Sequence, residues 1–239
     1  MRNCLIIATK EFKSYFRTPI AYVFMTVFLV VMGWFFFWVG NPPFFQRDHV
    51  DMGGFFFYIP YVFLFFVPAI SMRMWSEEKK LGTIEILLTM PIREGEVVVG
   101  KFLAGFGLLF VSLLFSLPIP LILNFVGEPD FGPIWGGYIS CLFLGGAYLA
   151  IGLFASGLND NQIVAFIIGL ILCFILFLIG MLPYQGILPG LVSFLEYLSL
   201  SYHFESIKRG LLDSRDVVYY LSVIIFFLYL NTRTVTKRR

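Results

Sequence analysis

The chain has 239 residues, of which 59% are hydrophobic and 13% are charged. A soluble domain needs a larger polar share to cover its surface, so this composition excludes the soluble class and indicates a polytopic membrane protein. The net charge of +2 is too small to favour nucleic acid as a partner.

The first segment, residues 3–17, has the pattern of an amphipathic helix. Its apolar and basic residues fall on opposite sides of a helical wheel: Leu5, Ala8, Phe12, Tyr15 and Phe16 against Lys10, Lys13 and Arg17. This pattern predicts an interfacial helix whose basic residues face anionic lipid head groups, although Ile6 and Ile7 do not fit it. Thr18-Pro19 then directs the chain into the membrane, because proline fits the first turn of a helix.

Six apolar stretches are long enough to cross a bilayer, whose core of about 30 Å requires about 20 helical residues. They cover residues 20–40, 55–72, 97–125, 134–157, 163–182 and 217–231. Pro68 interrupts the second stretch, and Pro118 and Pro120 break the third, so these prolines are candidate pathway or kink positions. Small residues recur in the fourth stretch and predict close helix packing, with a role in a substrate path as the alternative: Gly136, Ser140, Gly146, Ala150, Gly152 and Ser156.

Basic residues predict the orientation of the spans. With six spans, thirteen of the 17 basic residues fall on one side of the membrane, in the N-terminal segment, around the loop after the second span, and at the C-terminus. Basic residues collect on the cytoplasmic side, so both termini are expected there. The remaining four lie in the outer loops: Arg47, Lys208, Arg209 and Arg215.

Residues that could carry chemistry are scarce. The spans hold almost no ionisable side chain, and Lys101 lies about one turn inside its span, within reach of the interface. This argues against a proton-coupled carrier and an intramembrane enzyme. We expect no catalytic residue and no cofactor, because the chain also lacks a GxxxxGK[ST] loop.

The cysteines and histidines give no metal-binding pattern. Cys4, Cys141 and Cys173 have no CxxC or Cys/His spacing, so a disulfide framework or a zinc site is not expected. His49 and His203 map to the outer side and are interpreted as interfacial or loop histidines rather than metal ligands.

Aromatic residues are concentrated at the outer ends of the first two spans, and their role has two possible interpretations. Aromatic runs at residues 34–38 and 55–66 fit a lipid-anchoring belt, or else a wall that faces an apolar or lipid-linked cargo. The long loop at residues 183–216 predicts two short amphipathic helices on the outer face. Asp213 and Asp216 precede the last span as a helix N-cap would.

The charged segment at residues 76–91, SEEKKLGTIEILLTMP, lies between the second and third spans and predicts a short helix on the membrane surface. Two faces follow from helical spacing: Glu78, Gly82, Glu85 and Thr89 on one, and Leu81, Ile84 and Leu88 on the other. The apolar face is expected to hold the membrane domain, and the polar face to meet a partner. A loop helix that merely rests on its own bundle is the alternative.

At this segment the chain resembles the permease subunits of ABC-2 type ATP-binding cassette transporters, most closely the branch of the gliding-motility-associated and nitrous-oxide-reductase-maturation permeases. The resemblance is carried by three segments: RMWSEEKKLGTIEILLTMPIREGEVVVGKFLAG, ASGLNDNQIVAF and HFESIKRGLLDSRDVVYYLSV. It implies an all-α fold of six transmembrane helices in a single permease domain, residues 1–239. Residues 1–19 correspond to the family's connecting helix, and residues 183–216 to its extracellular helical hairpin.

The resemblance also implies an interface with an ATPase subunit. Residues 77–89 correspond to a coupling helix that sits in a groove on the ATPase, and the family's GTxExLL positions are Gly82, Thr83, Glu85, Leu87 and Leu88. Glu77, Glu78 and Thr89 complete the expected interface. ATP and Mg²⁺ bind the partner ATPase and not this chain. Permeases of this family act in pairs, as homo- or heterodimers, and an auxiliary extracytoplasmic subunit often joins them.

These inferences predict a multi-pass permease of the bacterial inner membrane. It would convert ATP-driven closure of cytoplasmic ATPase subunits into reorientation of a pathway between two permeases, with export as the direction that the family implies. The alternative is a non-transporting scaffold that anchors an ATPase to an envelope machine, whose sequence would look the same.

Overall fold

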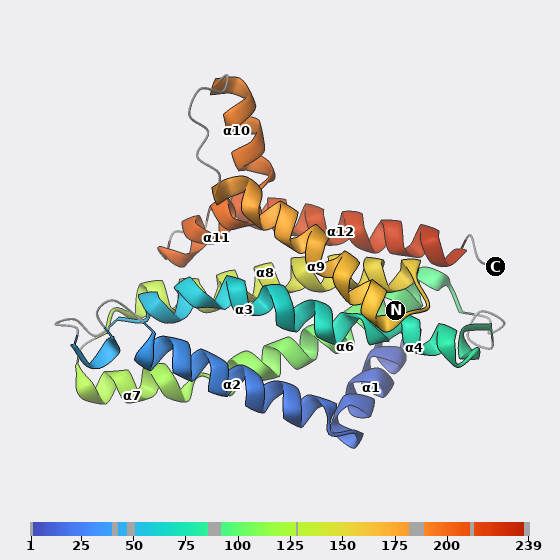
Figure 1. The fold of residues 1–239 in the computed structure, drawn as a ribbon, viewed down its shortest axis with the longest axis horizontal. Helices are drawn as coiled ribbons and strands as arrows, with labels where there is room; N and C mark the ends of the chain where they lie inside the picture. Colours follow the sequence, from blue (N-terminus) through green and yellow to red (C-terminus); the bar gives the residue numbers. More distant parts are fainter. Residues whose placement is uncertain are drawn as a thin grey trace.

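The computed structural model describes residues 2–39, 43–46, 51–85, 92–127, 129–181, 189–210 and 213–236. Within these ranges the regular structure is helical, with no strand, and Figure 1 shows the helices gathered into an elongated bundle. Six helical segments are long and apolar enough to cross a membrane. The predicted all-α fold with six spans is therefore confirmed.

The spans are built as follows. α1 (Arg2–Arg17) precedes the first span, α2 (Ile20–Trp38), which is followed by the short 3-10 helix η1 (Phe44–Gln46). The second span is α3 (Gly53–Ser71) with α4 (Arg73–Lys80), and the third is α6 (Glu94–Leu114) with α7 (Pro118–Val126). α8 (Phe131–Leu158) is the fourth and α9 (Gln162–Leu178) with η2 (Ile179–Met181) is the fifth. α10 (Pro189–Leu198) and α11 (Leu200–Lys208) precede the sixth span, α12 (Ser214–Thr236).

α8 is the central helix of the bundle. In its most apolar window 78% of residues are buried, against 22% for α9 and 17% for α12. It packs against α3, α6, α9, α11 and α12. Because α8 is rich in glycine and alanine, neighbouring backbones approach it closely.

The closest approach joins α3, α8 and α9. A Cβ at Gly152 of α8 would collide with the Ser71 hydroxyl of α3. A Cβ at Gly169 of α9 would lie 3.4 Å from Gly152 Cα and 3.6 Å from Pro68 Cβ. The predicted packing role of the small residues is confirmed at this crossing.

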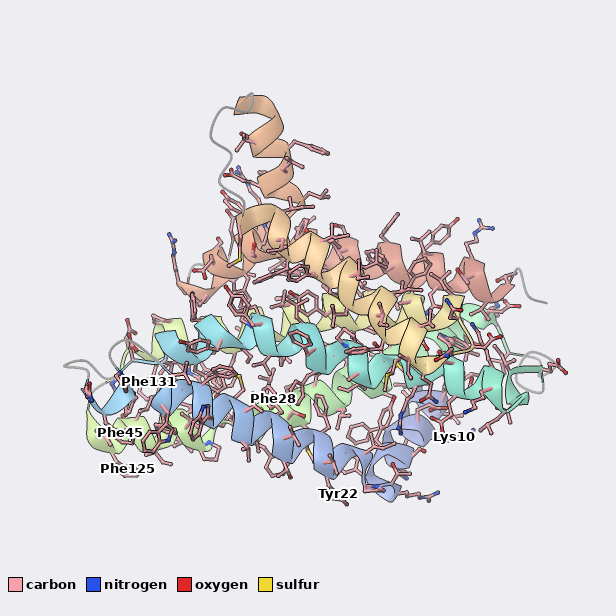
Figure 2. All side chains as sticks on the ribbon, viewed as in Figure 1. Lys10, Tyr22, Phe28, Phe45, Phe125 and Phe131 are labelled. Carbon is pink, nitrogen blue, oxygen red and sulfur yellow. The ribbon has the colours of Figure 1, made fainter. Side chains whose placement is uncertain are left out.

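The outer surface of the bundle is apolar, as expected for helices in lipid. Phe28 is fully buried between α2 and its neighbours, whereas Tyr22 and Phe125 point away from the bundle and are 55% and 89% exposed (Figure 2). Trp34 and Trp38 are also exposed and stack on each other with ring centroids 5.9 Å apart. Much of the second aromatic run is buried, including Phe55, Phe56 and Phe63.

The second span differs from the sequence prediction at its break, whereas the third breaks just before Pro118, as predicted. α3 runs through Pro68 to Ser71, and the interruption lies at Met72, from which α4 continues the span to Lys80. Buried Met74, Trp75 and Ser76 hold α4 against the bundle although the segment is polar in composition. In the third span α6 ends at Leu114, and Pro118 is the first residue of α7.

The loop before the last span contains the two expected helices. α10 projects away from the bundle, and α11 packs against α8 (Figure 1). Asp213 Oδ1 accepts a hydrogen bond of 2.9 Å from Arg215 N, which confirms the predicted cap of α12. Residues 182–188, 211 and 212 lie outside the described part of the chain, as does His49.

Candidate functional site

The charged segment is divided at Gly82 rather than being one helix. α4 ends at Lys80, and Gly82 adopts a φ of +69°, a left-handed conformation that favours glycine after a helix C-terminus. Residues 83–85 are helical again, while residues 86–91, which include Leu87, Leu88 and Thr89, lie outside the described part. The predicted continuous helix over residues 76–91 is therefore wrong at Gly82, where the reversal of φ ends the helical spacing.

The turn changes which side chains face outward. Glu77, Thr83 and Glu85 are exposed, as an interface with a partner requires. Leu81, predicted to pack on the membrane domain, is 67% exposed, whereas Ile84, the other described residue of that face, packs against the core. Glycine is favoured at position 82 by the backbone conformation of the turn. It is not required for close packing, because no atom lies within 4 Å of the position that a Cβ would occupy.

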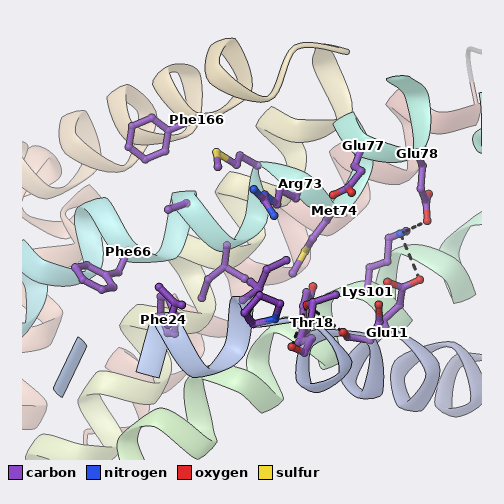
Figure 3. A pocket seen from close by; sticks show the side chains of 18 of the residues that line it. Glu11, Thr18, Phe24, Phe66, Arg73, Met74, Glu77, Glu78, Lys101 and Phe166 are labelled. Atoms are coloured by element: carbon purple, nitrogen blue, oxygen red, sulfur yellow. Dashed lines mark hydrogen bonds and ion pairs between the residues drawn. The ribbon is translucent and has the colours of Figure 1, made fainter. Parts of the chain in front are cut away.

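Glu78, predicted to face the ATPase, points inward to Lys101 of α6. Lys101 Nζ lies 2.6 Å from Glu78 Oε1 and 3.7 Å from Glu11 Oε1 of α1 (Figure 3). The ammonium also lies 4.9 Å from the centroid of the buried Trp75 ring, within cation–π distance. Lys101 is only 2% exposed, so it does not reach the interface as predicted. Its ammonium group instead links α6 to α1 and α4 through the ion pairs with Glu11 and Glu78.

A second set of bonds joins α4 to the end of α8. Ser156 Oγ accepts from Trp75 N and Ser76 N at 3.1 and 3.2 Å and donates to Met72 O at 2.8 Å. The first backbone N–H groups of a helix have no partner within it, so Ser156 caps α4 from the neighbouring helix. Lys79 Nζ donates to the carbonyls of Ser156 and Gly157, where a cation is favourable at the C-terminus of α8.

α1 packs along α6 as an amphipathic helix, but its two faces differ from the predicted ones. Ile7 fills the space above Gly100, where a Cβ would lie 2.8 Å from Ile7 Cγ2, and Phe12 covers Gly107. Leu5 is 63% exposed, beside Lys10 and Lys13. The helical wheel predicted the exposed side of the basic residues correctly. It assigned Leu5 to the packed face, whereas Ile7 packs there, because the glycines of α6 determine which apolar side chains fit.

At the opposite end of the bundle the structure brings together a polar pair that the sequence analysis missed. His203 of α11 is 1% exposed, and its Nδ1 lies 2.6 Å from Asp216 Oδ1 of α12. Its Nε2 lies 3.1 Å from the Tyr197 carbonyl of α10, and because a carbonyl only accepts, Nε2 is the donor. His203 is therefore a buried link between three helices, not a loop histidine. The sequence feature that could have indicated this pair was Asp216, a carboxylate in the first turn of α12.

The remaining predicted positions carry no polar chemistry. Pro68 lies in α3 against α8 and α9, Pro118 begins α7, and Pro120 is buried. Cys141 and Cys173 are buried thiols. Among the described residues, no three His, Cys, Asp or Glu side chains group as a metal site would require.

Comparison with known proteins identifies the family. A family model described as "ABC-2 family transporter protein" matches residues 43–231, from just before η1 to within α12. No curated protein matches the chain in a sequence search. The match covers most of the chain and five of its six spans, including α4, Lys101 and the α10–α11 region. The chain therefore belongs to the ABC-2 family of transporter proteins.

Proposed function

We propose that the chain is the permease subunit of an ATP-binding cassette exporter of the bacterial inner membrane. In this proposal a separate ATPase subunit hydrolyses ATP, and a second permease subunit completes the pathway. An auxiliary extracytoplasmic subunit is a further expected partner. Membership of the ABC-2 family supports a membrane subunit of a transporter and, in general, an ABC ATPase partner.

The observation that carries the proposal is the contrast between the two sides of the charged segment. Glu77, Thr83 and Glu85 are exposed at the end of the bundle. On the inner side, Ser76 and Lys79 bind the end of α8, and Glu78 binds Lys101 of α6. Hydrogen bonds with a charged partner are stronger than neutral ones, so a force on the exposed side reaches the spans through these bonds.

The path from the segment into the membrane is direct. α4 continues the second span, so displacement of α4, which carries the exposed Glu77, moves the helix that carries Pro68 and Ser71 into the crossing with α8 and α9. Closure of two ATPase subunits would push the segments of two permeases and change the angle between their second spans. Leu87 and Leu88 are proposed to help fix the short helix after Gly82.

The test is a charge reversal at Glu85. Glu85→Lys replaces an exposed carboxylate whose proposed role is polar contact with the ATPase, so folding is retained and association weakens by about tenfold or more. Co-purification of the ATPase and its transport-linked hydrolysis rate measure the effect. Glu205→Lys is the matched control, because Glu205 is exposed on α11 at the other end and forms only a surface pair with Lys208.

Two results would contradict the proposal. Unchanged co-purification and unchanged coupled hydrolysis in Glu85→Lys would remove Glu85 from the interface. Reconstitution of the complex in liposomes tests transport itself: ATP-dependent movement of a solute or lipid is expected. Normal ATPase binding without any such movement would favour the non-transporting scaffold.

A further inference from the structure

A cavity of about 910 Å³ lies beside the charged network, between α1, α2, the α3–α4 helix and Phe166 of α9. It is within the usual size range of small-molecule sites. Its two ends differ in chemistry. Figure 3 shows Phe24, Phe66 and Phe166 toward one end and Glu11, Glu78 and Lys101 toward the other. Such a division matches an amphiphile with an apolar chain and a charged head.

Two charged side chains of the cavity lining are exposed and lie outside the Lys101 network. Lys101 is compensated by Glu78 and Glu11. Arg73 and Glu77 also line the cavity, and both are exposed. Neither side chain forms a hydrogen bond or an ion pair with another residue in the described part of the chain. They are one turn apart on α4, a spacing that places two side chains on the same side of a helix.

A neutral donor lies at the same end of the cavity. Burial, together with the nearby carboxylates of Glu11, Glu78 and Glu77, raises the pKa of the Tyr15 hydroxyl well above its usual range. Tyr15 therefore keeps its proton at physiological pH and lines the cavity as a hydrogen-bond donor. A donor and a guanidinium suit a phosphate group, and a carboxylate suits an ammonium group.

The apolar end continues onto the outer surface of the bundle. Val23 and Val27 of α2 and Phe65 of α3 line the cavity and are 58%, 43% and 59% exposed. A chain that occupies the cavity therefore has an apolar route from the surrounding lipid. A second protein copy pressed onto this face would bury Arg73 and Glu77, and burial of charges without partners is strongly unfavourable.

We propose that this cavity binds a zwitterionic phospholipid with a primary ammonium group. Its phosphate binds Arg73, its ammonium binds Glu77, and one acyl chain lies along Phe24, Phe66 and Phe166. The inference goes beyond the proposed permease function, because binding requires neither the ATPase nor transport.

The experiment uses the full chain in lipid nanodiscs without ATPase. The probe is phosphatidylethanolamine that carries a photoreactive diazirine in one acyl chain, and labelled residues are identified by mass spectrometry. Labelling is expected to concentrate on residues 23–27, 65–70 and 166, and excess unlabelled phosphatidylethanolamine should compete more effectively than anionic phosphatidylglycerol. Equal labelling of α12 and of the cavity would overturn the proposal.

Matched variants separate the site from general lipid contact. Arg73→Gln removes a charge-assisted hydrogen bond and should weaken competition by unlabelled phosphatidylethanolamine about tenfold. Glu77→Gln should reduce the preference for this lipid over phosphatidylglycerol. Arg93→Gln is the control, because Arg93 is exposed at the start of α6 and does not line the cavity. Competition by unlabelled phosphatidylethanolamine that is unaffected by Arg73→Gln contradicts the proposed head-group contact.

A steric test does not depend on charge. Val23→Trp should fill the entrance and abolish labelling of Phe24 and Phe66, whereas Val30→Trp, 64% exposed on the same helix outside the cavity, should leave it unchanged. Val27→Cys tests the alternative that a second copy of this chain covers the cavity. Efficient disulfide formation between two copies of Val27→Cys, with no lipid labelling, would show that a second copy covers this face and would refute the lipid site.

Discussion

Lys101 is a buried cation whose two carboxylate partners come from different helices. Its side chain is 3% exposed, and Glu78 and Glu11 are 25% and 23% exposed. Lys101→Met should lower the free energy of unfolding by about 3 kcal/mol, because it leaves two partly buried carboxylates without their partner. Thermal unfolding in detergent measures the loss. Lys80→Met, at an exposed position of α4, is the control.

The Lys101–Glu78 pair allows a second comparison. Adding Glu78→Leu to Lys101→Met should recover part of the lost stability, since a buried ion pair replaced by apolar side chains is often neutral. A Lys101→Met protein as stable as the unmodified one would show that the network contributes nothing to the fold.

At the scale of single residues, the sequence predicted which side chains are exposed better than it predicted which side chains they contact. Glu85 and Thr83 are exposed as expected, and so are the basic residues predicted for the outer face of α1: Lys10, Lys13 and Arg17. Glu78 and Lys101 were misplaced, because helical spacing and hydropathy describe one segment at a time. The attraction between them joins residues 23 positions apart, and nothing in either segment alone specifies that contact.

Among the elements, the crossing of α3, α8 and α9 depends on the absence of a side chain at Gly152. Gly152→Val should lower the thermal midpoint strongly, because its side chain would overlap Ser71 and force α3 away from α8. Gly33→Val in α2 is the matched control, since no atom lies within 4 Å of the Cβ position there. Equal midpoints for the two variants would contradict the close packing.

The α10–α11–α12 region is expected to depend on the His203–Asp216 pair. Asp216→Leu leaves His203 Nδ1 buried without a partner, which costs about 2 kcal/mol and should accelerate hydrogen exchange across Leu200–Lys208. Asp216→Asn keeps a side chain able to hydrogen-bond and should have a smaller effect. Exchange of α11 that is the same in both variants and in the unmodified chain would contradict this role.

The number and type of the spans were predictable, and so was the break of the third span before Pro118, but the break of the second span at Met72 was not. Long apolar runs specify six spans because the bilayer requires a minimum length. The continuation of the second span into α4 was missed, because a polar segment was assumed to leave the bundle. Ser156, on a different span, supplies the cap that keeps the start of α4 helical.

For the whole molecule, an even number of spans places both termini on one side of the membrane. α1 and the C-terminal end of α12 lie toward the end of the bundle that carries α4 (Figure 1). The excess of basic residues there predicts the cytoplasm. Green fluorescent protein fused to either terminus should therefore fluoresce, and alkaline phosphatase fused at the same points should be inactive. Active phosphatase at one terminus only would contradict the six-span arrangement.

The hydroxyl of Ser156 has a consequence for how the molecule deforms. It bonds to three backbone groups of the α3–α4 junction at once, so separating α4 from α8 would break all three hydrogen bonds together. The two helix ends are therefore expected to move together. Bending is expected where α-helical hydrogen bonds give way to i→i+3 bonds. In the third span that place is residues 115–117, where Ser116 N and Leu117 N donate to Leu113 O and Leu114 O just before Pro118.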